Sequence, residues 1–279
     1  MTVQTIDTGL FKLDGGAMFG VVPKPIWQRN YPADEQNRCT WAMRCLLVEA
    51  QNRLVLVDTG IGTKQDEKFF GHYDLSGDAS LTTSIQQAGY AAEDITDVLL
   101  THLHFDHVGG AVERINDMLR PTFKEAVYWT HPAHLAWAIS PNPREKASFL
   151  RENIVPLQES GQLHFFGDTY LGIPGLDLIY VDGHTEKMAL PKLTIGDRTV
   201  LYCADLIPSA GHVPLPYVMS YDVRPLQTMF EKEQVLSEAA ANNWILVFEH
   251  DPYIEAATVE RTEKGIRVRQ QGNLADLLA

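Results

Sequence analysis

Five short apolar runs in the chain each end at an acidic residue or a histidine. The runs LVLVD, DVLLTH, LIYVDGH, VLYCAD and ILVFEH place Asp58, His102, His184, Asp205 and His250 at the ends of predicted strands. Short apolar runs rich in valine, isoleucine and leucine are typical of buried strands. Potential metal ligands at several strand ends indicate a site that draws on distant parts of the chain.

Helical spacing of apolar residues alternates with these runs. Helices are predicted from Ser80 as N-cap to Gly89, and over Pro132–Ile139, 144–153 and Pro225–Asn242, the last with proline in its first turn and an apolar stripe. Strands are predicted at 45–50, 54–57, 97–101, 126–130, 162–166, 178–181, 192–195, 199–203 and 244–248. Strands followed by helices in both halves of the chain predict an α/β protein.

The second apolar run opens into THLHFDH at residues 101–107, which contains four potential metal ligands. In an extended stretch, side chains two residues apart point to the same face, so His102, His104 and Asp106 are expected to converge. The tight turn that must follow brings His107 round from the other side. At Val108-Gly109-Gly110 the backbone is expected to turn closely into a helix. One HxHxDH segment can therefore supply ligands to two metal ions, and it predicts a dinuclear site.

Composition and charge bear on the number of domains and exclude some classes of partner. The chain has 279 residues, 45% of them apolar, and a net charge of -13. That length allows one large core, and we expect residues 1–279 to form a single domain. The negative charge argues against nucleic acid or an anionic membrane as a partner, because both would repel the chain. The expected partner is a small-molecule substrate, and a homodimer stays open.

The cysteines and the N-terminus concern the compartment. Cys39, Cys45 and Cys203 form neither an even disulfide framework nor a CxxC pair, so we expect them to be buried and reduced. The first residues, MTVQTIDTG, lack a basic segment followed by an apolar stretch, and no apolar run approaches the length of a membrane span. A cytoplasmic location is expected.

The motifs resemble those of metallo-β-lactamase-fold hydrolases. The matching residues span positions 58 to 250 in the family's order, and they are Asp58, His102, His104, Asp106, His107, His184, Asp205 and His250. The resemblance implies the αβ/βα four-layer sandwich, in which two mixed β-sheets are flanked by helices. The fold expected from strand and helix order agrees with this architecture.

The resemblance also implies how the ligands are divided. His102, His104 and His184 would hold one metal, while Asp106, His107 and His250 would hold the second. Asp205 would bridge both metals, and Asp58 would lie behind a ligand histidine and fix its orientation. Two divalent ions are expected, with Zn²⁺ as the default for a histidine-rich site that carries a catalytic water.

The chemistry expected of such a site is hydrolysis. Two cations that share one water lower its pKa toward neutrality, so that it can attack an electrophilic carbon or phosphorus without a protein nucleophile. Asp205 would act catalytically as the bridge, and Asp106 would carry a proton to the leaving oxygen. No GxSxG signature is present in the sequence. An ester, lactone or related acyl compound is the expected substrate.

Within the family, the motifs are most similar to those of N-acyl homoserine lactone lactonases, and the run ADLIPSAGHVPLPY at 204–217 adds to this likeness. The best-known lactonases carry a tyrosine three residues after the bridging aspartate, where this chain has Pro208. Candidates to replace that tyrosine are His212, Tyr217 and Tyr221, and the alternative is that the metal acts on the carbonyl oxygen alone. The predicted substrate pocket comprises Phe105, Met188, His212, Tyr217 and Tyr221.

Other activities of the same fold stay open. A phosphotriesterase is the main rival, and a carboxylic ester or thioester hydrolase resembling glyoxalase II is another. A true β-lactamase is disfavoured by the aspartate bridge, and a diiron oxidoreductase typically has glutamate where this chain has His104. A metal-free binding module should show gaps in the ligand set, and this chain has none. Outside that set, His72, His131, His134 and His164 are expected to have packing or surface roles.

Overall fold

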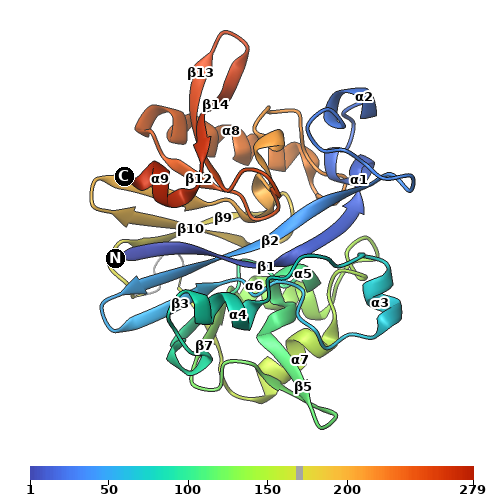
Figure 1. Ribbon diagram of the computed structural model, residues 1–279, viewed down its shortest axis with the longest axis vertical. Coiled ribbons are helices and arrows are strands. Elements are labelled where there is room, and N and C mark those ends of the chain that lie inside the picture. Colours follow the sequence, from blue (N-terminus) through green and yellow to red (C-terminus); the bar gives the residue numbers. More distant parts are fainter. Residues whose placement is uncertain (168–171) are drawn as a thin grey trace.

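Two six-stranded sheets form the framework of the protein in a computed structural model, which describes residues 1–167 and 172–279 (Figure 1). The first sheet runs in the order β1 (Thr2–Asp14), β2 (Arg38–Ala50), β3 (Arg53–Val57), β4 (Asp97–Leu99), β7 (Val127–Thr130) and β8 (Leu163–Phe165). Its first three strands pair antiparallel, and β3, β4, β7 and β8 pair parallel. The sheet is therefore mixed.

The second sheet is also mixed. Its order is β14 (Gly265–Gly272), β13 (Ala256–Thr262), β12 (Ile245–Val247), β11 (Arg198–Tyr202), β10 (Met188–Ile195) and β9 (Leu176–Val181). Only β11 and β12 pair parallel. A separate hairpin consists of β5 (Val112–Ile115) and β6 (Met118–Pro121).

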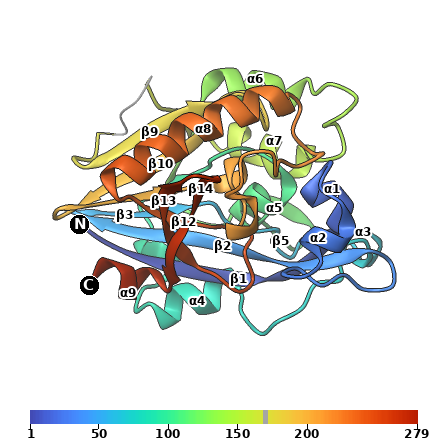
Figure 2. The ribbon, with the colours of Figure 1, turned by 90° about the horizontal axis from the view of Figure 1, so that it is seen from above.

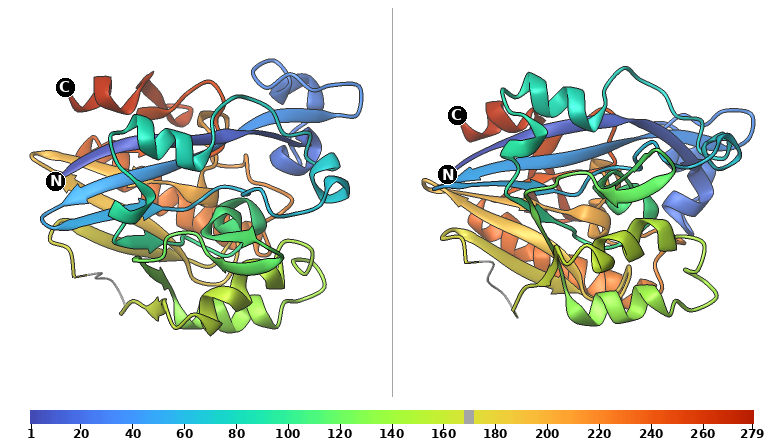
Figure 3. Two further views of the ribbon diagram at one scale, coloured as in Figure 1. Left: turned by 60° about the horizontal axis from the view of Figure 1, so that its bottom comes forward. Right: turned by 90° about the horizontal axis from the view of Figure 1, so that it is seen from below.

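The two sheets pack face to face between helices. In β2, Leu46 and Val48 face the core shared with the second sheet, while Cys45 and Leu47 face the helix-covered side. Figure 2 shows α8 (Pro225–Asn242) outside the second sheet and α4 (Leu81–Gln87) outside the first. Figure 3 shows the same layers from two other sides. The predicted αβ/βα sandwich is confirmed.

Shorter elements complete the described part of the chain. They are α1 (Gly15–Phe19), α2 (Lys24–Trp27), α3 (Glu67–Gly71), α5 (Phe105–Val108), α6 (Pro132–Ile139), α7 (Arg151–Glu159), α9 (Leu274–Leu278) and the 3₁₀ turns η1 (Ala92–Asp94), η2 (Gly109–Ala111), η3 (Ala204–Leu206) and η4 (Ala210–His212). The predictions for α6 and α8 match to the residue, and Ser80 caps α4 as predicted. The sequence pattern did not predict strands at the positions of β13, β14 or the β5–β6 hairpin.

The prediction of a helix over 144–153 is wrong. Residues 143–148 form turns. The side chain of Asn142 accepts hydrogen bonds from the backbone N–H groups of Arg144 (2.9 Å) and Glu145 (3.2 Å), and the N–H of Ser148 bonds to the carbonyl oxygen three residues back, at Glu145 (2.8 Å). The helix in this region, α7, begins only at Arg151 and continues through Pro156. Arg144, Glu145 and Ser148 of this turn segment line a cavity of the protein.

Two expectations about the chain as a whole can be compared with the structure. Cys39, Cys45 and Cys203 are free and buried, as predicted. Among the described residues, none of the helices combines the length and apolarity needed to cross a lipid bilayer.

Candidate metal centre

The predicted ligands come together at one end of the two sheets. Asp58 follows β3, residues 101–107 follow β4, Asp205 follows β11 and His250 follows β12. His184 lies in the connection that follows β9. Because both sheets end their parallel strands at this edge, residues far apart in sequence meet there, as ligands do at the carboxyl ends of strands in other α/β proteins.

The segment 101–107 reaches the centre by a different backbone path from the predicted one. Its first part is irregular, but Phe105–Val108 forms a turn of helix, α5, with His104 as N-cap. Asp106 is therefore not in extended register with His102 and His104, and the extended reading is wrong at this position. The helical turn carries Asp106 and His107 together toward the second group of ligands.

Glycine at position 109 permits this turn to lie against its neighbour. A Cβ atom at Gly109 would overlap the backbone carbonyl group of Ile61, and one at Gly110 would overlap the carbonyl oxygen of Thr59. The close approach after the HxHxDH segment, which the sequence predicted, is thus a backbone-to-backbone contact.

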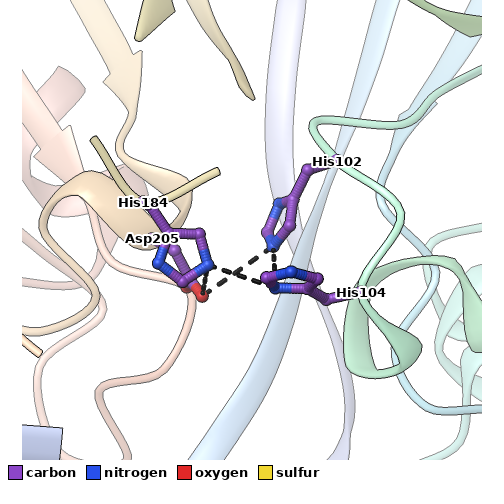
Figure 4. Close-up of side chains that lie close together, drawn as sticks. All are labelled: His102, His104, His184 and Asp205. Carbon is purple, nitrogen blue, oxygen red and sulfur yellow. Dashed lines mark hydrogen bonds and ion pairs between the residues drawn. The ribbon is translucent and has the colours of Figure 1, made fainter. Parts of the chain in front are cut away.

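The first ligand group contains His102, His104, His184 and Asp205 (Figure 4). His102 and His104 approach from one side, and His184 and Asp205 from the other. His104 Nδ1 lies 3.1 Å from His102 Nε2 and 3.2 Å from His184 Nε2, and His184 Nε2 lies 3.1 Å from Asp205 Oδ2. All four side chains are buried.

The second group contains Asp106, His107 and His250, and Asp205 lies between the two groups. Asp205 Oδ1 is 3.0 Å from His250 Nε2, and Asp205 Oδ2 is 3.6 Å from His107 Nε2. Asp106 Oδ2 lies 3.8 Å from His250 Nε2 and 3.9 Å from His107 Nε2. One carboxylate oxygen of Asp205 therefore faces both groups, and the other faces only the second.

The outer nitrogen atoms of the histidines are held by the protein. His184 Nδ1 pairs with Asp222 Oδ1 at 2.9 Å, and His250 Nδ1 donates to the carbonyl oxygen of Ala42 at 2.8 Å. His102 Nδ1 lies 3.1 Å from the hydroxyl of Thr101. These contacts fix each ring so that its Nε2 atom faces the centre.

His107 lies in front of two carboxylates. Its Nδ1 atom is 3.2 Å from Asp58 Oδ2 and 3.0 Å from Glu249 Oε1. Asp58 also accepts hydrogen bonds from the backbone N–H (2.8 Å) and hydroxyl (2.6 Å) of Thr101. Asp58 is therefore placed behind a ligand-type histidine, where the resemblance put it.

The charges of the centre are strongly coupled. Burial alone would lower the pKa values of His184 and His250, but the Asp205 carboxylate, together with Asp222 at His184 and Glu249 at His250, outweighs burial and raises these pKa values to about 10 and about 9. Burial would raise the pKa of Asp205, yet the charges of His250, His184 and His107 hold it well below its usual value. The carboxylate of Asp205 therefore favours a positive charge on the neighbouring imidazoles, and a metal cation bound at this position would displace the protons of His184 and His250.

The donor set fits divalent cations. It combines imidazole nitrogen with carboxylate oxygen, which zinc and similar divalent metals accept. His107 Nε2 is buried and has no hydrogen-bond partner among the described residues, so a bound cation would satisfy it. The ligand atoms within each group lie within 4.8 Å of one another. The chain therefore has the donors for two divalent ions.

A cavity of about 220 Å³ opens onto this centre. His104, Asp106, His184, Asp205 and His250 form its floor. Its walls are Leu13, Met18, Phe105, Arg144, Glu145, Ser148, Met219, Ser220 and Tyr221. Of the five predicted pocket residues, the structure places Phe105 and Tyr221 at this cavity.

The placement of Met188, His212 and Tyr217 in the pocket is wrong. Met188 is buried in the core between the sheets. His212 is buried with its ring stacked on Phe19, with Nδ1 2.7 Å from the hydroxyl of Ser209 and Nε2 2.8 Å from the carbonyl oxygen of Met18. Tyr217 packs against the cluster that contains Phe19. Closeness in sequence to ligands therefore does not bring these three residues to the cavity.

His134 has the packing role expected of it. Its Nε2 accepts a hydrogen bond from the backbone N–H of Leu103 at 2.8 Å, and its Nδ1 donates to the carbonyl oxygen of Glu186. It therefore supports the segment between His102 and His104 from below. His131 accepts from the backbone N–H of Ala133 at the start of α6, and His72 and His164 are exposed.

Sequence reasoning missed three carboxylates at the centre, namely Glu145, Asp222 and Glu249. Glu249 precedes His250 in the motif FEHD, and its position next to a ligand was the available signal. Asp222 and Glu145 lie in loops, where no periodic pattern marks them. Only tertiary structure brings Asp222 to His184 and Glu145 to His104.

A family model supports the same reading of the site. Residues 44–250 match the model of the metallo-beta-lactamase superfamily. This match covers most of the chain and includes every ligand-type residue of the two groups. The chain belongs to the metallo-beta-lactamase superfamily, and it is a metal-dependent hydrolase.

Individual relatives agree with this class. A probable metallo-hydrolase of Mycobacterium tuberculosis is 27% identical over 274 residues, 85% of this chain and 85% of its own. An N-acyl homoserine lactonase of Bacillus cereus is 27% identical over 204 residues, 64% of this chain and 72% of its own. The crystal structure of a probable metal-dependent hydrolase from Staphylococcus aureus has a TM-score of 0.88 at 26% identity, covering 98% of this chain and 96% of that one. AidC, a dizinc quorum-quenching lactonase, shares the fold with a TM-score of 0.77 at 22% identity, with 98% and 95% covered.

Proposed function

We propose that this protein is a lactonase that opens N-acyl homoserine lactones, an activity of the quorum-quenching type. The observation that carries the proposal is the cavity, because it joins a two-group metal-ligand set to an apolar wall. A compact polar head can reach the ligands while an apolar tail leaves water along the wall. The lactonase relative in Bacillus cereus and the dizinc lactonase fold support the same reading.

The ligands would be divided between two zinc ions. His102, His104 and His184 would hold the first ion, and Asp106, His107 and His250 the second. Asp205 would contact both, because its Oδ2 atom faces both groups and its Oδ1 atom faces the second. When bound, two divalent ions lower the pKa of a shared water and polarise a carbonyl group.

The side chains of the protein handle the proton and the carbonyl oxygen. In lactone hydrolysis, water adds to the carbonyl carbon, the ring C–O bond breaks, and the leaving oxygen takes a proton. Asp106 lines the cavity and is placed to carry that proton. Tyr221 is 38% exposed, and the partial burial of its ring together with the carboxylates of Asp14 and Asp106 raises the pKa of its hydroxyl, which stays protonated. Tyr221 can therefore donate a hydrogen bond to the carbonyl oxygen of the substrate. It would take the role of the tyrosine that lactonases carry at the position of Pro208.

The apolar part of the cavity indicates the rest of the substrate. Leu13, Met18, Phe105 and Met219 line it together with Tyr221. Each methylene of an acyl chain that leaves water there contributes about 0.8 kcal/mol. Longer acyl chains are therefore favoured over short ones.

The rival function is phosphotriester hydrolysis, since the same ligands can serve attack on phosphorus. The proposal is tested by a matched panel of a long-chain and a short-chain N-acyl homoserine lactone, a carboxylic ester, a thioester and an aryl phosphotriester at equal concentration. We expect the long-chain lactone to be hydrolysed fastest, with one proton released per turnover in a pH-indicator assay. Efficient cleavage of the phosphotriester with inert lactones would replace the lactonase with its rival and leave the metal site intact.

A further inference from the structure

Of the five histidines in the two groups, His104 alone turns Nδ1 toward the other ligands. Its Nε2 atom points away from them and toward the turn segment 143–148. There it lies 3.4 Å from Oε1 of Glu145. Both atoms are buried, and neither has a hydrogen-bond partner among the described residues. A buried donor and a buried acceptor that face each other are each costly unless they pair.

The carboxylate of Glu145 is held in this position from behind. Its Oε2 atom accepts hydrogen bonds from Trp137 Nε1 at 2.7 Å and from Asn142 Nδ2 at 2.6 Å. These two donors occupy Oε2, so Oε1 faces His104, and the hydroxyl of Thr185 also lies close to the carboxylate. Glu145 is only 3% exposed, so bulk water does not compete for the carboxylate. A small movement of either side chain brings the 3.4 Å contact into the hydrogen-bond range.

We propose that Glu145 is a positioning residue that acts through His104. By accepting a hydrogen bond from the Nε2–H group, it selects the tautomer with a free Nδ1 lone pair and fixes the ring plane toward His102 and His184. This inference rests on the proposed metal centre and deepens it. The turn segment 143–148, for which the sequence predicts a helix, thereby supplies the outer partner of a proposed metal ligand.

The role makes a site-selective prediction. Glu145→Ala should weaken metal binding at the group of His102, His104 and His184 by about 10–100-fold, the range for loss of such a partner. Binding at the group of Asp106, His107 and His250 should stay unchanged, because Glu145 contacts none of its members. A general loss of packing would weaken both groups and lower the melting temperature.

The experiment is a two-step Zn²⁺ titration of the full chain by calorimetry, with Co²⁺ absorption spectra as a second readout. Asp222→Asn serves as a positive control, because Asp222 holds His184 of the same group. Glu159→Ala, at an exposed position of α7, serves as a neutral control. Glu145→Gln keeps one acceptor oxygen and should give a smaller loss at the same step, which covers the case in which the alanine variant does not fold.

Weakening of one step alone, with a changed Co²⁺ spectrum and a melting temperature close to that of the original protein, would support the role of Glu145. Two unaltered steps, or equal weakening of both, would overturn it. If the original protein itself binds no zinc, the proposed metal centre fails instead, so the two failures are distinguishable.

Discussion

Asp205→Asn is expected to remove most of the bound metal and most of the hydrolase activity together. Asp205 Oδ2 lies 3.1 Å from His184 Nε2, and its Oδ1 lies 3.0 Å from His250 Nε2, so one carboxylate serves both ligand groups. An asparagine side chain is neutral and has only one oxygen, so it cannot balance two cations. We expect kcat/KM to fall by more than about 100-fold, beyond the effect of losing an outer partner.

The matched comparison is Asp58→Asn. Asp58 contacts Thr101 and the outer Nδ1 atom of His107 but belongs to neither of the two ligand groups, so this variant should weaken metal affinity by about 10–100-fold and regain activity in excess zinc. Elemental analysis and initial rates on both purified variants measure the difference. Equal and small effects of the two substitutions would show that Asp205 is not the bridge.

Lys232→Met is expected to lower the free energy of unfolding substantially. Lys232 lies in α8 and is fully buried, and its Nζ atom donates to the carbonyl oxygens of His212 (2.9 Å), Pro214 (3.1 Å) and Tyr217 (2.8 Å). Methionine would leave three carbonyl groups without this donor, at a cost of about 1 kcal/mol or more each. The free energy of unfolding should therefore fall by at least about 3 kcal/mol.

Urea denaturation measures that change. Lys68→Met is the control, because Lys68 is exposed on the short helix α3, and it should change the free energy of unfolding by less than about 0.5 kcal/mol. If Lys232→Met lowers the free energy of unfolding by less than about 1 kcal/mol, the three carbonyl groups find other partners, and Lys232 does not hold the loop 212–217 in place.

The sequence predicted the parts of the molecule that follow from local pattern. The helices Pro132–Ile139 and Pro225–Asn242 match because proline marks the first turn of each and apolar spacing continues to the end. The ligand-type residues that the structure brings together could be selected from the sequence because each follows an apolar strand or lies in the HxHxDH segment. In both cases residues that are close together in sequence are sufficient to indicate the helix or the ligand position.

The parts that failed depend on contacts that no periodic pattern marks. The segment 143–148 has a helical composition but forms turns, and its Glu145 side chain accepts hydrogen bonds from Trp137 and Asn142. His212 lies close in sequence to Asp205, yet stacking on Phe19 keeps its ring in the core. The approach of Glu145 to His104 joins two loops, and no sequence spacing indicates such a contact.

The measurement that tests the account most directly is elemental analysis of the purified, folded and active protein. Two groups of buried ligands joined by Asp205 predict about two zinc or similar divalent ions per chain, as in cocatalytic sites. Removal of the metal by a chelator should abolish hydrolysis, and its return should restore it. An active, fully folded preparation that contains one metal ion or none would contradict the dinuclear centre.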